Sequence, residues 1–191
     1  MTVRIVNAGI KSQTPFYKSG PTGAMTHPIT KAQYDSLSIN DYVWFLATME
    51  PKWQTPRAKE LNGKIYRIRC SKLKEYIDKN RHNKALIQYD FEGRPRIVIP
   101  LEELTEVGRI DEKTMLESGI NGMGTSTYST NGGSITKNYS ITSTDSGKTS
   151  NKGNTGEWLM KGYFEKNEKV DYVIISEDTY GPTDITIGLK K

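Results

Sequence analysis

The sequence predicts a mainly β protein with a few short helices. Short runs of apolar and β-branched residues recur along the chain, and clusters of Gly, Pro, Asn and Asp separate them, as is typical of strands joined by turns. Only 35% of the 191 residues are hydrophobic, so we expect one small core and much polar chain. No apolar run approaches the ~18–20 residues of a transmembrane helix, and we therefore expect no contact with a membrane.

Residues 1–40 are expected to form an extended arm, because Pro and Gly interrupt this part of the chain repeatedly. Within it, residues 3–6 have the composition of a short strand, and residues 30–37 that of a short helix with Thr30 as N-cap. The N-terminus lacks the apolar region and cleavage site of a signal peptide, so we expect cytoplasmic synthesis. Cys70 is the only cysteine, which excludes a disulfide scaffold and a cysteine-based zinc site.

The segment 41–107 carries the clearest pattern of elements. Four of its stretches have the length and composition of strands: 41–47, 64–70, 85–89 and 94–99. The first of these is apolar on both faces, and the second alternates between apolar and basic residues. A short helix is expected at 71–80, with Leu73, Tyr76 and Ile77 on one face.

The order of these elements resembles a small SH3-like or Tudor-like barrel. The stretches that carry the resemblance are, in order, DYVWFLA, GKIYRIR, ALIQYD, FEG, RPRIVI and PLEEL. The resemblance implies a binding function, because such barrels engage peptides, modified side chains or nucleic acid through their loops and one open face. The candidates for a cation-binding cage are the aromatic residues Trp44, Tyr66, Tyr89 and Phe91. The alternative is that at least two of these rings belong to the core.

Basic residues concentrate in the middle of the chain. Residues 50–109 carry 14 basic and 9 acidic side chains. Two pairs of arginines each share a strand face: Arg67 with Arg69, and Arg94 with Arg96. If the two strands are neighbours, the four guanidiniums form a stripe that binds the phosphates of a nucleic acid. The alternative is that these arginines form ion pairs with Glu92, Glu102 and Glu103.

The remainder of the chain divides into three parts. Residues 108–120 are expected to be a linker with a short helix at 111–119, capped by Asp111. Residues 121–156 are rich in Ser, Thr, Asn and Gly; they are interpreted as a hairpin around Asn131-Gly132 or as a flexible linker, and then as a mobile loop from 143. The last part, 157–191, is expected to end in a β-hairpin formed by strands at 171–175 and 184–189.

No catalytic constellation, metal site or cofactor motif stands out in the sequence. There are two histidines, His27 and His82, which exclude a three-histidine metal site, and His27 is expected to be solvated in its loop. The stretch 142–149 ends like a phosphate-binding loop but lacks the first glycine.

The leading hypothesis is therefore a non-enzymatic assembly or binding protein. In style the sequence resembles small structural proteins of bacteriophage particles, which implies incorporation into a virion and contacts with partner protein subunits. The arm at 11–40 and the hairpin at 121–142 would make those contacts. Two alternatives remain open: a nucleic-acid-binding regulator that uses Arg67, Arg69, Arg94 and Arg96, and a small nuclease or toxin-type enzyme.

Overall fold

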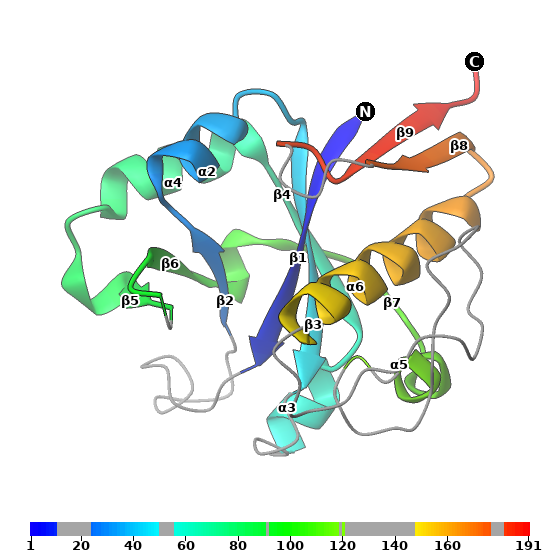
Figure 1. The fold of residues 1–191 in the computed structure, drawn as a ribbon, viewed down its shortest axis with the longest axis horizontal. Coiled ribbons are helices and arrows are strands. Elements are labelled where there is room, and N and C mark those ends of the chain that lie inside the picture. Colours follow the sequence, from blue (N-terminus) through cyan, green and yellow to red (C-terminus); the bar gives the residue numbers. More distant parts are fainter. Residues whose placement is uncertain (11–23, 50–55, 91, 119, 121–147, 177–181) are drawn as a thin grey trace.

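The structure is a computed structural model. The part of the chain that it describes consists of two β-sheets and the helices packed against them (Figure 1). The described residues are 1–10, 24–49, 56–90, 92–118, 120, 148–176 and 182–191. The expectation of a mainly β fold with short helices is confirmed.

Nine strands and five α-helices occur in the described part of the chain. The strands are β1 (Thr2–Ile10), β2 (Ala24–Pro28), β3 (Tyr42–Met49), β4 (Lys64–Arg69), β5 (Ile87–Tyr89), β6 (Pro95–Pro100), β7 (Thr105–Arg109), β8 (Val170–Ile175) and β9 (Ile185–Leu189). The helices are α2 (Lys31–Ser36), α3 (Pro56–Leu61), α4 (Cys70–Asn80), α5 (Glu112–Ser118) and α6 (Lys148–Glu165), with short 3₁₀ turns at Lys84–Leu86 and Leu101–Glu103.

The larger sheet has six strands in the order β7-β4-β3-β1-β9-β8. At its centre β1 and β3 are parallel, in a register that runs from Val3 opposite Tyr42 to Ile10 opposite Met49. The other neighbouring pairs are antiparallel, and β1 meets β9 only at its first residues. The expected C-terminal hairpin is confirmed as β8 and β9.

The smaller sheet contains β2, β6 and β5, with β6 in the middle. It takes β2 from the N-terminal part of the chain, as the larger sheet takes β1. The prediction that residues 1–40 are an arm beside a self-contained unit at 41–107 is therefore wrong for residues 1–10 and 24–40. These residues supply strand partners from far away in sequence, which local composition does not reveal. The remainder of the expected arm, 11–23, lies outside the described residues.

Two hydrophobic cores lie on the two faces of the larger sheet. Alternate residues of β3 point to opposite sides, so Val43 and Phe45 enter one core while Trp44 and Leu46 enter the other. The first core is closed by α2, α4 and the smaller sheet, and the second by α5 and α6. The sequence-based expectation that this strand is apolar on both faces is confirmed.

Three short helices agree with expectation. The helix expected at 71–80 is α4, whose Leu73 and Ile77 are fully buried. Helix α2 follows Thr30 as predicted, although the Thr30 side chain makes no capping hydrogen bond. Helix α5 is capped by Asp111, whose carboxylate accepts a hydrogen bond from the backbone N–H of Thr114 at 2.8 Å.

Helix α6 corrects the sequence interpretation of residues 148–156 as a mobile loop. Gly, Asn, Ser and Thr in its first half are poor helix formers, so propensity argues against a helix there. Its second half buries Leu159, Met160 and Phe164 against the larger sheet, and this burial outweighs the weak local preference. The hairpin expected at 121–142 lies outside the described residues.

Gly108 in β7 lets helix α6 approach the sheet closely. The ring of Tyr163 lies over Gly108, and its hydroxyl donates a hydrogen bond to the backbone oxygen of Val107 at 3.0 Å. A Cβ at position 108 would overlap that hydroxyl, whereas a Cβ at Gly162 would meet nothing.

We expect Gly108→Ala to lower the free energy of unfolding by about 1–3 kcal/mol, because the Tyr163 ring has to move away from the sheet. Gly162→Ala is the matched control: it should raise the stability of α6 by up to about 1 kcal/mol, since alanine favours a helix over glycine. Urea unfolding of both variants checks this. Equal effects of the two substitutions would contradict the close packing of α6 on β7.

Candidate functional site: a basic cavity beside helix α6

A cavity of about 790 Å³ lies between helix α6 and one side of the larger sheet, where β7 is the edge strand and β4 and β3 follow it. We call it the α6 cavity. Its apolar lining consists of Trp44, Val107, Ile110, Trp158, Leu159, Tyr163 and Phe164. Its polar lining consists of Arg67, Arg109, Asp111, Thr114, Lys166 and Asn167. The volume lies within the range of small-molecule sites.

Aromatic rings form one wall of the α6 cavity. The ring centroids of Trp44 and Phe164 lie 4.8 Å apart in an edge-to-face arrangement, and Tyr163 lies 6.4 Å from Trp44. This packing holds the Trp44 indole rigidly. Trp44 is only 6% exposed. Its Nε1–H is buried, and it has no hydrogen-bond partner in the described part of the chain.

Arg67 carries a positive charge over this aromatic wall. It lies opposite Trp44 in the β3–β4 ladder, and its guanidinium carbon is 4.7 Å from the Tyr42 ring centroid and 5.4 Å from that of Trp44. The guanidinium carbon of Arg69 lies 4.9 Å from the same Tyr42 ring centroid. These cation–π contacts fix the guanidiniums without neutralising them. Neither arginine forms an ion pair with a carboxylate of the described residues.

Arg109 stands at the other end of the cavity wall. Its guanidinium donates hydrogen bonds to the backbone oxygens of Glu60 and Asn62, at 2.9 and 3.1 Å. Carbonyl groups orient this arginine but leave its full charge in place. Thus Arg67 and Arg109 are both held by neutral partners.

Asp111 is the single carboxylate among the described cavity residues. It caps α5 and accepts hydrogen bonds from the backbone N–H and the hydroxyl of Thr114, both at 2.8 Å. These hydrogen bonds, and to a smaller extent the charge of Lys166, hold the pKa of Asp111 below its usual value. One carboxylate that is already engaged faces three cations, so the α6 cavity carries net positive charge.

The four arginines predicted to form a phosphate-binding stripe are not brought together. Arg67 and Arg69 share the face of β4 that faces the second core, as expected. Arg94 and Arg96 belong to the smaller sheet and its preceding turn. Since β4 and β6 lie in different sheets, the condition for a continuous stripe is not met.

Arg94 and Arg96 are also engaged locally. Arg94 forms ion pairs with Asp90 at 2.8 Å and with Glu92 at 3.0 Å, so the predicted partner Glu92 is confirmed. The guanidinium of Arg96 donates hydrogen bonds to the hydroxyl and the backbone oxygen of Thr26.

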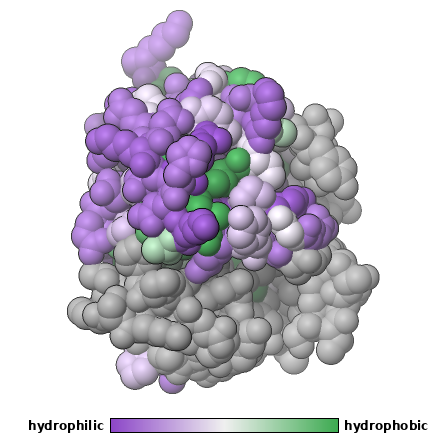
Figure 2. All heavy atoms as spheres, turned by 90° about the vertical axis from the view of Figure 1, so that its left-hand side faces the viewer, coloured by the Kyte–Doolittle hydropathy of each residue, from purple (hydrophilic) through white to green (hydrophobic). Residues whose placement is uncertain are grey.

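Figure 2 shows the side of the molecule on which α2, α4 and β5 lie in Figure 1. The described residues visible on this side are mostly hydrophilic, with a small apolar area among them.

The expected aromatic cage is not formed by its described members. Trp44 and Tyr66 are both buried but belong to different cores, because Tyr66 lies opposite Phe45 and so faces away from Trp44. Tyr89 is 70% exposed in the smaller sheet, and Phe91 lies outside the described residues. The alternative that at least two of these rings are core residues is confirmed.

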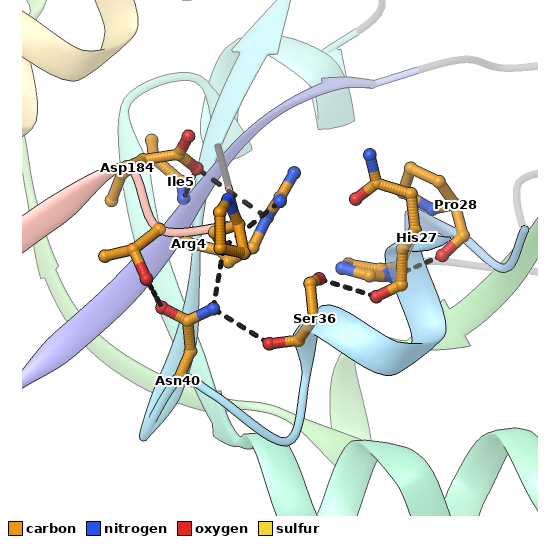
Figure 3. A network of polar contacts seen from close by, with 10 residues as sticks. Arg4, Ile5, His27, Pro28, Ser36, Asn40 and Asp184 are labelled. Atoms are coloured by element: carbon orange, nitrogen blue, oxygen red, sulfur yellow. Dashed lines mark hydrogen bonds and ion pairs between the residues drawn. The ribbon is translucent and has the colours of Figure 1, made fainter. Parts of the chain in front are cut away.

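His27 is not solvated, contrary to the sequence-based expectation. It is fully buried in β2 beside Phe45, and burial lowers its pKa to about 3. Its Nδ1 lies 2.7 Å from the Pro28 backbone oxygen, which requires Nδ1 to be the protonated nitrogen (Figure 3). The buried Nε2 has no hydrogen-bond partner among the described residues. Pairing of β2 with β6 draws this loop-like sequence into the core.

A network of polar contacts connects β1 with the segments that precede β3 and β9 (Figure 3). Arg4 donates a hydrogen bond to the Pro182 backbone oxygen and lies 3.8 Å from the Asp184 carboxylate. Asp184 accepts a hydrogen bond from the Ile5 N–H at 2.8 Å. Asn40 links Pro182 to Ser36 through its side-chain amide.

Glu157 of α6 adds a second carboxylate near Asp184. Burial, and then the negative charge of Asp184, raise the pKa of Glu157 to about 7, while Arg4 opposes the shift. The pKa of Asp184 is also raised, mainly by burial. Arg4 therefore faces two partly buried carboxyl groups, Glu157 and Asp184. Because its pKa is raised, Glu157 stays protonated up to about pH 7.

Sequence reasoning missed much of the α6 cavity. Trp158, Tyr163 and Phe164 were recognisable as an aromatic cluster, but no strand or helix was assigned to them. Tyr42, Arg109 and Lys166 carry no local signal, because their relation to Arg67 arises from strand pairing and helix packing.

The described residues contain no group of three or more His, Cys, Asp or Glu side chains placed to hold a metal ion. In the same part of the chain, no helix combines the length and the apolar character needed to cross a membrane. Comparisons of the chain with protein-family models, with curated proteins and with solved structures gave no match.

The pKa of Glu157 gives a prediction for the pH dependence of stability. The folded protein keeps the Glu157 proton up to about pH 7, whereas the unfolded chain loses it near its ordinary value of 4.5. The folded state thus binds more protons between these values, so the contribution of Glu157 to the unfolding free energy falls as pH rises. The amide of Glu157→Gln stays neutral, so this variant should gain roughly 1–3 kcal/mol over the wild type between pH 4.5 and 7.

Glu168→Gln, at an exposed position, is the matched control and should show no such gain. Chemical denaturation across this pH range measures the difference. His27 is present in all three proteins, so its opposite effect below pH 6.5 cancels in the comparison. A Glu157→Gln advantage that does not change with pH would contradict the assignment.

Proposed function

We propose that this is a non-enzymatic binding protein whose binding site is the α6 cavity. Its ligand carries negative charge and a flat apolar part. The observation that carries the proposal is the pairing of an aromatic wall with guanidiniums that have no carboxylate partner among the described residues.

The charge of the cavity supports an anionic ligand. Arg67 is half-buried, so it has lost part of its hydration without gaining a counterion. A carboxylate or phosphate in the cavity supplies that counterion and charge-assisted hydrogen bonds. Because the rings of Tyr42 and Trp44 already fix the guanidinium, little side-chain entropy remains to be lost on binding.

The lining of the cavity supports a flat apolar part in the ligand. Trp158 and Val107 are half-buried, so they present apolar surface that a ligand can cover. Such sites, mostly apolar with a few convergent polar groups, are typical of small-molecule and cofactor recognition.

A second candidate is the nucleic-acid-binding function suggested by the sequence. The guanidiniums of Arg67 and Arg69 both lie within 5 Å of the Tyr42 ring centroid, at 4.7 and 4.9 Å, and Arg67 also lines the α6 cavity. Alternating cations and aromatic rings are typical of single-strand binding surfaces. Arg94 and Arg96 are not part of this group, so the candidate now rests on the β4 arginines.

Partner subunits and incorporation into a bacteriophage particle stay predictions from the sequence. Residues 24–40, expected to contact partners, are strand and helix of the fold itself. The partner contacts would therefore fall to residues 11–23 and 121–142, which lie outside the described part.

The variant Arg67→Met tests the binding site, because methionine keeps an apolar stem over the rings and removes the charge. We expect its affinity for the fluorescent anion anilinonaphthalene sulfonate to fall about tenfold or more, the effect of losing a charged hydrogen bond. Arg94→Met is the matched control and should bind like the wild type, since Arg94 lies outside the α6 cavity. Equal affinities of Arg67→Met and the wild type would overturn the proposal.

A further inference from the structure

We propose that the ligand of the α6 cavity is a small organic dianion with one anionic group at each end of a flat apolar body, held at one end by Arg67 and at the other by Arg109. This inference rests on the proposed function, and it names the class of ligand. The anionic groups can be carboxylates or phosphates, because a guanidinium donates paired hydrogen bonds to either.

The two arginines come from opposite ends of the β4–β7 ladder, and both line the α6 cavity. Arg67 lies opposite Thr105 in this ladder, and Arg109 lies opposite Lys64. The two positions are three residues apart on β4 and four residues apart on β7, which corresponds to about 10–13 Å at the rise of a β-strand. The backbone therefore places the two cations at separate points of the cavity wall.

The anchors of the two side chains keep the charges apart. The guanidinium of Arg67 lies 4.7 Å from the ring centroid of Tyr42, and Tyr42 lies opposite Arg69, the last residue of β4. The guanidinium of Arg109 donates a hydrogen bond to the backbone oxygen of Asn62, which precedes the first residue of β4. A charge-assisted hydrogen bond is only about 2.7–2.9 Å long, so one carboxylate or phosphate cannot reach both guanidiniums.

Apolar surface lies between the two charges. Val107 stands between Thr105 and Arg109 on β7 and lines the cavity. Tyr163 lies beside it, since its hydroxyl donates a hydrogen bond to the Val107 backbone oxygen at 3.0 Å. Both residues are half-buried, so a body that covers them removes further apolar area from water. The part of the ligand that joins the two anionic groups is therefore expected to be apolar.

Each end of the cavity carries an excess of positive charge. Near Arg109, the carboxylate of Asp111 accepts hydrogen bonds from Thr114, and Lys166 is close enough for its charge to act on that carboxylate. Two cations thus face one carboxylate there. At the other end, Arg67 has no carboxylate partner among the described residues. One negative charge at each end of the ligand balances both ends of the cavity, whereas a monoanion leaves one of them positive.

The test compares the binding of naphthalene sulfonates to the full chain by isothermal titration calorimetry. Naphthalene-2,6-disulfonate carries one sulfonate on each ring, at opposite ends of a flat apolar body. Naphthalene-1,3-disulfonate is the matched ligand control, because it has the same rings and the same charge with both sulfonates on one ring. Naphthalene-2-sulfonate carries a single sulfonate. Sulfonates stay ionised at neutral pH, so protonation of the probes does not affect the comparison.

We expect naphthalene-2,6-disulfonate to bind about tenfold more tightly, or better, than either of the other two probes. It alone places an anionic group at both arginines, and the expected gain is that of one further hydrogen bond to a charged group. The two disulfonates have equal charge, so their comparison removes the general attraction of a basic protein for anions.

The variants Arg67→Met and Arg109→Met each remove one of the two charges. In either variant the affinity of naphthalene-2,6-disulfonate relative to naphthalene-2-sulfonate should fall close to one, because only one end of the cavity still holds an anionic group. Arg94→Met is the matched control and should keep the ratio of the wild type, since Arg94 pairs with Asp90 and Glu92 outside the α6 cavity.

Equal affinities of the two disulfonates for the wild-type chain would overturn the inference, and this comparison needs no variant to fold. If anilinonaphthalene sulfonate still binds in a way that depends on Arg67, the proposed function survives that result. A wild-type ratio that neither arginine variant changes would also overturn the inference, because the second sulfonate would then meet another group. If neither these probes nor anilinonaphthalene sulfonate bind, the proposed function fails as well.

Discussion

The parallel pairing of β1 with β3 is the constraint on which the rest of the structure depends. It joins the N-terminal strand to the strand that carries Trp44 and Phe45, and it places both strands in the middle of the larger sheet. Parallel neighbours need a crossover between them, and the chain uses this connection for β2 and α2. Both faces of the central strands are therefore covered, which produces two separate cores and gives each residue of β3 a fixed side.

Helix α6 covers one of these faces and forms one side of the α6 cavity. Its buried residues Leu159 and Met160 fill the space over the centre of the sheet, while Trp158 and Tyr163 reach the end where β4 and β7 lie. The helix gains its stability from this packing, because half of its sequence disfavours a helix. This packing has an energetic cost at Glu157. It buries the carboxyl group near the negative charge of Asp184, and both effects raise the pKa of Glu157 and favour its neutral form.

The sequence predicted what depends on near neighbours and missed what depends on distant ones. The alternation of β4, the helix α4 and the C-terminal hairpin follow from local periodicity and turn residues. The pairing of β1 with β3 joins residues about forty positions apart, and no composition reveals it. The same limit explains His27, which has the sequence context of a loop but occupies a buried strand beside Phe45. It also explains why the expected cage members Trp44 and Tyr66 face different cores.

The state of each arginine matters more for function than the number of basic residues. Arg94 has two carboxylate partners, so its charge is already balanced on an exposed turn. Arg67 and Arg109 are oriented instead by ring faces and backbone oxygens, and neither has a carboxylate partner among the described residues. The proposed function depends on this difference, because a cation that is oriented without being neutralised can still pair with an anion. The basic residues from the middle of the chain are thus distributed over both sheets. Two of those without a carboxylate partner among the described residues, Arg67 and Arg109, line the α6 cavity together with the aromatic wall.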